Sequence, residues 1–154
     1  MSNYFSWDEL KQLKAVEGHT LNRVIYHYWQ NVVNPGEAFE FLDKLELEFS
    51  EGKKLIIGTS EETEGALALA MDFDAEKQHF LLLHEFGGKL GMRSADLSQN
   101  DLWVPVLNHT LQSCDLVKEG QSYRTDAILL NFGEEKLEVR PNVEGLLVEP
   151  FEDV

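Results

Sequence analysis

A segment of strict alternation, Leu45-Glu-Leu-Glu-Phe49, constrains the fold of this chain more than any other feature. Successive side chains of a β-strand point to opposite faces of the sheet. The segment therefore predicts a strand with an apolar face toward a core and an acidic face toward solvent. The polar residues Ser50-Glu-Gly-Lys53 follow, and Lys54-Leu-Ile-Ile57 returns as a second apolar segment. The pattern predicts a β-hairpin, so antiparallel strands are expected to contribute much of the fold.

Other short segments have the alternating, β-branched or aromatic composition that is typical of strands. They lie at 20–29, 66–73, 109–117, 126–132, 136–140 and 145–149. Short strands that are separated by regular turns and accompanied by few helices predict a mainly-β fold, either a sandwich or an open barrel.

A helix is predicted near the N-terminus, over residues 6–15, because Ser6 and Glu9 have the spacing of a capping box and Gly18 can end the helix. Residues 75–86 fit two structures: Asp74 is placed to cap a helix, whereas the apolar residues around Phe80 also alternate as in a strand. We favour the strand. Residues 96–108 are expected to form a loop or a short helix that carries Trp103.

The chain also matches itself in three places that occur in the same order. His19-Thr-Leu21 matches His109-Thr-Leu111, residues 49–57 match 132–139, and residues 64–67 match 144–147. We interpret the matches as an internal duplication of two three-stranded units, 19–67 and 109–147, which pack together about a pseudo-twofold axis. The alternative is that two unrelated hairpins with polar turns look alike.

Length and charge limit the class of protein. A chain of 154 residues has the size of a single domain, here predicted to span 1–154. It holds 28 Asp and Glu against 13 Lys and Arg, a formal net charge of −15, which argues against binding to nucleic acid or to anionic membranes. No segment has the pattern of a secretory signal or a membrane span, so a cytoplasmic location is expected. The lone Cys114 is expected to be a buried thiol.

No motif for catalysis, metal binding or cofactor binding is present in the sequence. The five histidines have no metal-ligand spacing, no Gly-x-Ser-x-Gly element occurs, and Gly87-Gly-Lys-Leu-Gly91 lacks the Ser or Thr of a phosphate loop. We therefore predict no metal and no cofactor, and we favour a protein without catalytic activity.

The composition favours a protein-binding module that uses an acidic surface to bind a basic protein. Bacterial toxin inhibitors, such as immunity proteins that mask basic nucleases, share this general character. Candidate contact residues are acids on the outward sides of strands and aromatic residues in and beside the segment 30–41, with the alternative that the phenylalanines pack into the core. These residues are Glu46, Glu48, Glu138, Trp29, Phe39 and Phe41. A second alternative is that the acidity serves only solubility.

The other class of function is a small-ligand-binding β-barrel or an enzyme of an unfamiliar kind. Its site would lie between the two repeat units, near His19, Trp103 and His109, because the duplication places the two histidines at equivalent positions.

Overall fold

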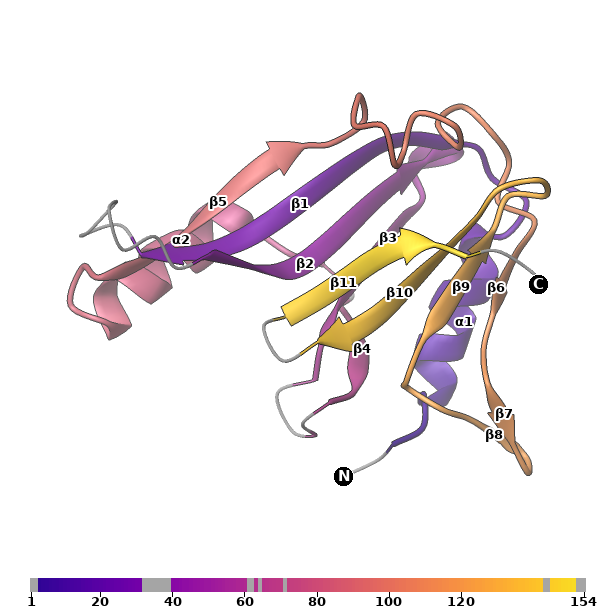
Figure 1. Ribbon diagram of the computed structural model, residues 1–154. Coiled ribbons are helices and arrows are strands. Elements are labelled where there is room, and N and C mark those ends of the chain that lie inside the picture. Colours follow the sequence, from indigo (N-terminus) through magenta and orange to yellow (C-terminus); the bar gives the residue numbers. More distant parts are fainter. Residues whose placement is uncertain are drawn as a thin grey trace.

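A computed structural model describes residues 3–31, 40–60, 63, 65–70, 72–142 and 145–151. Its described residues form a mainly-β fold, as predicted, with nine strands in one sheet that curls into an open half-barrel (Figure 1). Two further short strands form a separate hairpin. The helices are α1 (Trp7–Val16) and α2 (Ala75–Glu85). The strands are β1 (Leu21–Asn31), β2 (Glu40–Phe49), β3 (Lys54–Thr59), β4 (Leu67–Ala70), β5 (Leu90–Asp96), β6 (Ser113–Asp115), β7 (Lys118–Glu119), β8 (Ser122–Tyr123), β9 (Ile128–Asn131), β10 (Lys136–Asn142) and β11 (Gly145–Pro150).

Two runs of antiparallel pairs make up most of the curled sheet. The first run is β1-β2-β3-β4, and the second is β6-β9-β10-β11. A parallel contact between Gly145 of β11 and Leu42 of β2 joins them. The predicted hairpin is confirmed as β2 and β3. β5, which the sequence did not reveal, pairs with β1.

The core lies on the concave face of the sheet. Leu45, Leu47 and Phe49 of β2 point into it, as the alternation predicted. Trp103 comes from the segment between β5 and β6, which is a series of turns, and it is fully buried in the same core. The apolar side chains of both runs therefore share one core.

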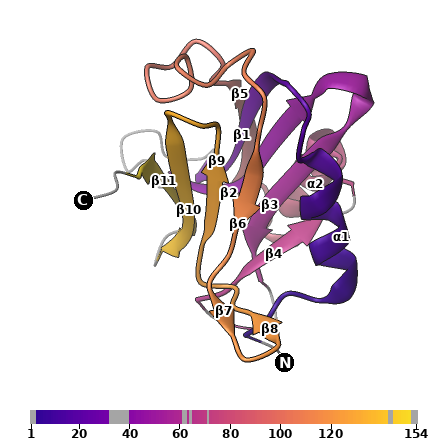
Figure 2. The same ribbon diagram turned by 90° about the vertical axis from the view of Figure 1, so that its right-hand side faces the viewer.

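Helix α1 fits its predicted position and covers the open side of the half-barrel. Ser6 and Glu9 form the expected capping box. The helix packs against β3, β4 and β6, and Figure 2 shows it beside these strands.

Two carboxylates of the α1 region bind the outermost strands of the curled sheet. Glu9 accepts a hydrogen bond from the Leu69 amide of β4, at 2.9 Å, and Glu17 accepts one from the Cys114 amide of β6, also at 2.9 Å. These bonds satisfy amides that an edge strand would otherwise leave exposed. The helix therefore links β4 and β6, the two edge strands at the ends of the order from β4 to β6.

The strand favoured over residues 75–86 is wrong, because this segment is helix α2. The Asp74 side chain accepts a hydrogen bond from the Lys77 amide and caps the helix. The segment has no β-branched residue and is rich in Ala, Leu, Glu, Lys and Gln, all of which favour helix. The apparent alternation around Phe80 did not reflect a buried face, because Phe80 and Leu81 are both exposed.

The single thiol, Cys114, is partly buried between β6 and α1. Its Sγ lies 3.7 Å from the Leu13 carbonyl oxygen. Burial, and then the nearby Glu17 and Asp115 carboxylates, raise the pKa of the Cys114 thiol to about 12. The thiol therefore stays protonated at neutral pH, and its reactivity is low.

Asp96, at the end of β5, is expected to make stability depend on pH. Hydrogen bonds from Ser98, and then from Arg23, lower the pKa of Asp96 to about 2, whereas an unfolded aspartate has a pKa of about 3.9. A lowered pKa means that the carboxylate stabilises the fold above about pH 4, and that this stabilisation is lost as the pH falls toward about 2.

Because the Asp96 side chain is half-exposed, solvent screens the effect, and Asp96→Asn is expected to remove only about 0.5–1 kcal/mol at neutral pH. Urea denaturation of both proteins across a pH series measures the difference. It should shrink as the pH approaches about 2. A difference that stays constant over the whole series would contradict the prediction.

Candidate functional site

The aromatic residues predicted as partner contacts lie on neighbouring strands. Trp29 of β1 pairs with Phe41 of β2, and their ring centroids are 5.3 Å apart. Both side chains are half-buried. Among the described residues, Trp29 Nε1 is buried and has no hydrogen-bond partner. Phe39 lies outside the described residues. Trp29 and Phe41 therefore pack against each other as a cross-strand pair.

The expectation that Glu46 points to water is wrong. Only 7% of Glu46 is exposed, and its Oε1 lies 2.9 Å from Nε2 of the buried His27 on β1. Lys54 Nζ lies 3.4 Å from the other carboxylate oxygen of Glu46. The ring of Phe73, from the segment between β4 and α2, packs on His27 with centroids 4.8 Å apart. The convex face of β2 is therefore partly covered, which the alternation of β2 could not reveal.

The other two predicted acids are partly exposed, and each contacts an arginine. Glu48 of β2 lies 3.5 Å from Arg23, and Glu138 of β10 lies 2.8 Å from Arg140. The positive charge of the neighbouring arginine offsets part of the negative charge that each carboxylate presents to a partner. These strand faces are thus weaker acidic surfaces than the sequence suggested.

The segments that hold His19 and His109 lie side by side, as the alternative function required. The Leu111 amide donates to the His19 carbonyl, and the Leu21 amide donates to the His109 carbonyl. The imidazoles, however, have different surroundings: His19 Nδ1 lies 3.3 Å from Ser50 Oγ, whereas His109 borders a surface hollow of about 490 Å³.

Trp103, the third residue of that alternative, has no exposed surface and fills the interior. Its Nε1 donates a hydrogen bond to the Tyr26 hydroxyl, at 2.8 Å. The predicted interior position is therefore occupied by a core side chain. A ligand there would have to displace it.

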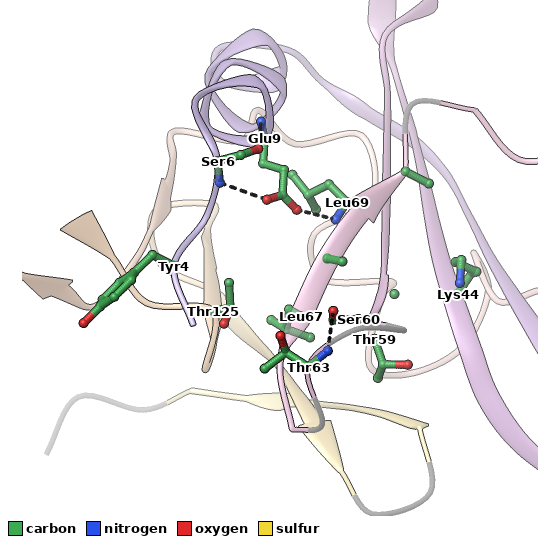
Figure 3. A pocket seen from close by; sticks show the side chains of 13 residues that line it. Tyr4, Ser6, Glu9, Lys44, Thr59, Ser60, Thr63, Leu67, Leu69 and Thr125 are labelled. Carbon is green, nitrogen blue, oxygen red and sulfur yellow. Dashed lines mark hydrogen bonds between the residues drawn. The ribbon is translucent and has the colours of Figure 1, made fainter. Parts of the chain in front are cut away.

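A polar hollow of about 420 Å³, which the sequence did not suggest, lies between the start of α1 and the strands β3 and β4 (Figure 3). Several of its polar groups already bond to one another. Glu9 accepts from the amides of Ser6 and Leu69, and Ser60 Oγ accepts from the Thr63 amide. These bonds serve the helix cap and the β3–β4 turn. The hollow is therefore mainly a structural junction.

Helix α2 presents the apolar surface that most needs an explanation. Phe80 is 61% exposed and Leu81 is 51% exposed, and Phe86 after the helix is also exposed. Phe80 and Leu81 border a shallow hollow of about 420 Å³ together with Asp74, Glu76 and Lys77. We call Phe80 and Leu81, which border this hollow together, the α2 patch. Large exposed side chains gathered on one element commonly mark an interaction surface.

The α2 patch lies at the end of the molecule opposite to α1, where α2 packs against β5 (Figure 1). Within the helix only Leu82 is fully buried, so the side of α2 that faces away from β5 carries Phe80 and Leu81. The sequence did contain a signal, the run Phe80-Leu-Leu-Leu83. It could not be interpreted while the segment was assigned to a strand.

No protein-family model, curated protein or solved structure matches the chain. Among the described residues, no group of three or more His, Cys, Asp or Glu is arranged to hold a metal ion. The described helices include none that is long and apolar enough to cross a membrane.

Proposed function

We propose that the protein is a binding module that docks a basic protein on the α2 patch. The observation that carries the proposal is the exposure of Phe80 and Leu81 side by side on a helix whose other side packs on the sheet. Buried aromatic and aliphatic anchors supply much of the affinity at protein interfaces, and leaving both in water is unfavourable for an isolated protein.

The negative charge around the α2 patch indicates the kind of partner that would bind there. Residues 72–86, which include the helix and its cap, hold four acidic residues and one lysine, and the whole chain has a net charge of −15. Apolar anchors with an acidic rim are complementary to a partner that carries an apolar depression rimmed by Lys and Arg. The negative field of the chain would also accelerate the encounter with such a partner.

The proposal predicts that the α2 patch, and not exposed apolar residues elsewhere, is needed for binding. The test variant is Phe80→Ser with Leu81→Ser. The matched control is Val104→Ser with Val117→Ser. These valines are about as exposed as Leu81 but lie away from α2, Val104 between β5 and β6 and Val117 between β6 and β7. Each protein is used as bait in an extract of the cells that express it, and the captured proteins are identified by mass spectrometry.

We expect the wild type and the valine control to capture a protein with a surplus of Lys and Arg, and the α2 variant to bind it at least about tenfold more weakly. With that protein purified, the association rate should fall steeply as salt rises, while the dissociation rate changes little. Capture of no basic protein, or equal capture by the α2 variant, would overturn the proposal.

We also propose that the two antiparallel runs are an internal duplication. The support is that β1-β2-β3-β4 and β6-β9-β10-β11 follow the same pairing order. Each run has four strands, however, where the sequence predicted three, and β4 and β11 extend beyond the matched segments. The strands differ in length, from eleven residues in β1 to three in β6. Superposition of residues 19–67 on 109–147 tests the duplication, and a different path of the chain in the two segments would contradict it.

A further inference from the structure

Three side chains on the convex face of the sheet form a continuous hydrogen-bonded chain. The hydroxyl Oγ of Ser94 on β5 lies 2.6 Å from Nδ1 of His27 on β1. The other ring nitrogen of His27, Nε2, lies 2.9 Å from Oε1 of Glu46 on β2. His27 and Glu46 are buried, whereas Ser94 is exposed. The hydroxyl of an exposed residue is thus linked through an imidazole to a buried carboxylate.

The register of the strands brings these residues together. His27 is directly opposite Ser94, and Glu46 is opposite Ile25, one position along the same face from His27. The Met92 amide donates to His79 Nδ1 on α2 and is therefore turned away from β1. Amides two residues apart on a strand point the same way, so the Ser94 amide is also turned away from β1. Side chains at such non-hydrogen-bonded pairs approach closely, which accounts for the short Ser94–His27 contact.

The partners of His27 determine where its proton lies. A carboxylate can only accept, so Glu46 receives the hydrogen bond from Nε2–H, and Nδ1 is then the unprotonated nitrogen. The Ser94 hydroxyl donates to this nitrogen. Lys54 Nζ forms an ion pair with the second oxygen of Glu46, at 3.4 Å. This is the order of roles, nucleophile, base and orienting acid, by which a catalytic triad is recognised on any fold.

We propose that Ser94 is a nucleophile that hydrolyses small carboxylic esters, with His27 as its general base and Glu46 as a positioning residue. The inference goes beyond the proposed binding function and uses a different set of residues. It rests on the two hydrogen bonds of His27 together with the exposure of Ser94.

In the first step, Ser94 Oγ attacks the ester carbonyl carbon while its proton passes to His27 Nδ1. The C–O bond to the alcohol then breaks, and His27 returns the proton to the departing alkoxide, which leaves an acyl-serine. Water adds to the acyl-serine carbonyl carbon while its proton passes to His27. The bond from this carbon to Oγ then breaks, and His27 returns the proton to Oγ, which releases the carboxylic acid and restores Ser94. One ester and one water thus become one acid and one alcohol.

The fold also supplies a donor for the oxyanion that forms in each step. The Ser94 amide points away from β1, and β1 is the only described strand with which β5 pairs. An amide of the nucleophilic residue itself is a common oxyanion donor. Glu46 keeps the imidazole in the reactive tautomer and stabilises the imidazolium that forms.

The test uses a fluorophosphonate probe, which reacts preferentially with activated serines, and peptide mapping of the adduct on the intact chain. Two serines of the same chain serve as internal controls. Ser50 lies beside His19, at 3.3 Å, but no described carboxylate contacts the Nε2 atom of that ring. Ser6 is exposed at the cap of α1 and has no histidine contact among the described residues. We expect the adduct on Ser94 and on neither control.

The variants Ser94→Ala, His27→Gln and Glu46→Gln separate the three roles. Ser94→Ala should abolish labelling and acetyl ester hydrolysis, and His27→Gln should slow labelling at least about 100-fold. Glu46→Gln should slow labelling and change its pH profile, which a purely structural role would not do. Phe80→Ser with Leu81→Ser should label as the wild type does, so this result is independent of the binding proposal.

Circular dichroism and thermal unfolding establish that each variant is folded. If a buried substitution at His27 or Glu46 unfolds the chain, the wild-type adduct map still decides the question. An unlabelled wild type, or labelling of Ser50 or Ser6 at the rate of Ser94, would overturn the proposal.

Discussion

Trp103→Ala is expected to lower the free energy of unfolding by about 3–5 kcal/mol. The indole is fully buried in the core that both antiparallel runs share. Its removal would leave a cavity among rigidly packed neighbours. It would also take away the hydrogen bond that Trp103 donates to the partly buried Tyr26 hydroxyl, at 2.8 Å.

Trp7→Ala is the matched control, because it deletes the same indole from a side chain that is 71% exposed. It should cost less than about 1 kcal/mol. Urea denaturation of the two variants and the wild type, followed by circular dichroism, measures both differences. Equal destabilisation by the two substitutions would contradict the position of Trp103 in the core.

Gly145→Ala is expected to lower the free energy of unfolding by about 2–5 kcal/mol, because it adds a clash to an unfavourable backbone conformation. Gly145 has a φ angle of +104°, which side-chain-bearing residues rarely adopt. A Cβ atom there would lie 2.2 Å from the Leu42 carbonyl oxygen, which is backbone and cannot rotate away. This is the position at which β11 meets β2, so the substitution strains the junction between the two runs.

Gly52→Ala separates the two contributions. Gly52 has a φ angle of +71°, but a Cβ atom there would meet nothing within 4 Å. The control should therefore cost only the backbone strain, about 1 kcal/mol. Thermal and urea unfolding of both variants provide the comparison. If Gly145→Ala is no more destabilising than Gly52→Ala, the result would contradict the close contact between β11 and β2.

Local signals were sufficient wherever a few neighbouring residues decide the structure. The capping box of Ser6 and Glu9 predicted α1, and the alternation from Leu45 to Phe49 predicted both a strand and its core face. The turn that follows predicted the hairpin of β2 and β3. In each case the hydrogen bonds or side-chain directions involve residues within a few positions of one another, so the sequence contains the whole signal.

Local signals were ambiguous where the same residues were compatible with two kinds of secondary structure. Residues 75–86 have a helix cap at Asp74 and also an apparent alternation, and the wrong one was favoured. Nor could the sequence show that a helix here would leave Phe80 and Leu81 in solvent, because that depends on what packs against the helix. The candidate binding surface therefore became visible only once the helix was placed on β5.

The sequence by itself determined the mainly-β class, the position of α1, the β2–β3 hairpin and the strongly acidic character of the chain. Only the tertiary structure decided that Glu46 is buried and that His27 stands between Glu46 and Ser94. These three residues come from three strands, and Ser94 lies 67 positions along the chain from His27. The physical reason is that strand register joins residues that are distant in sequence, whereas side-chain periodicity indicates only the face on which each residue lies.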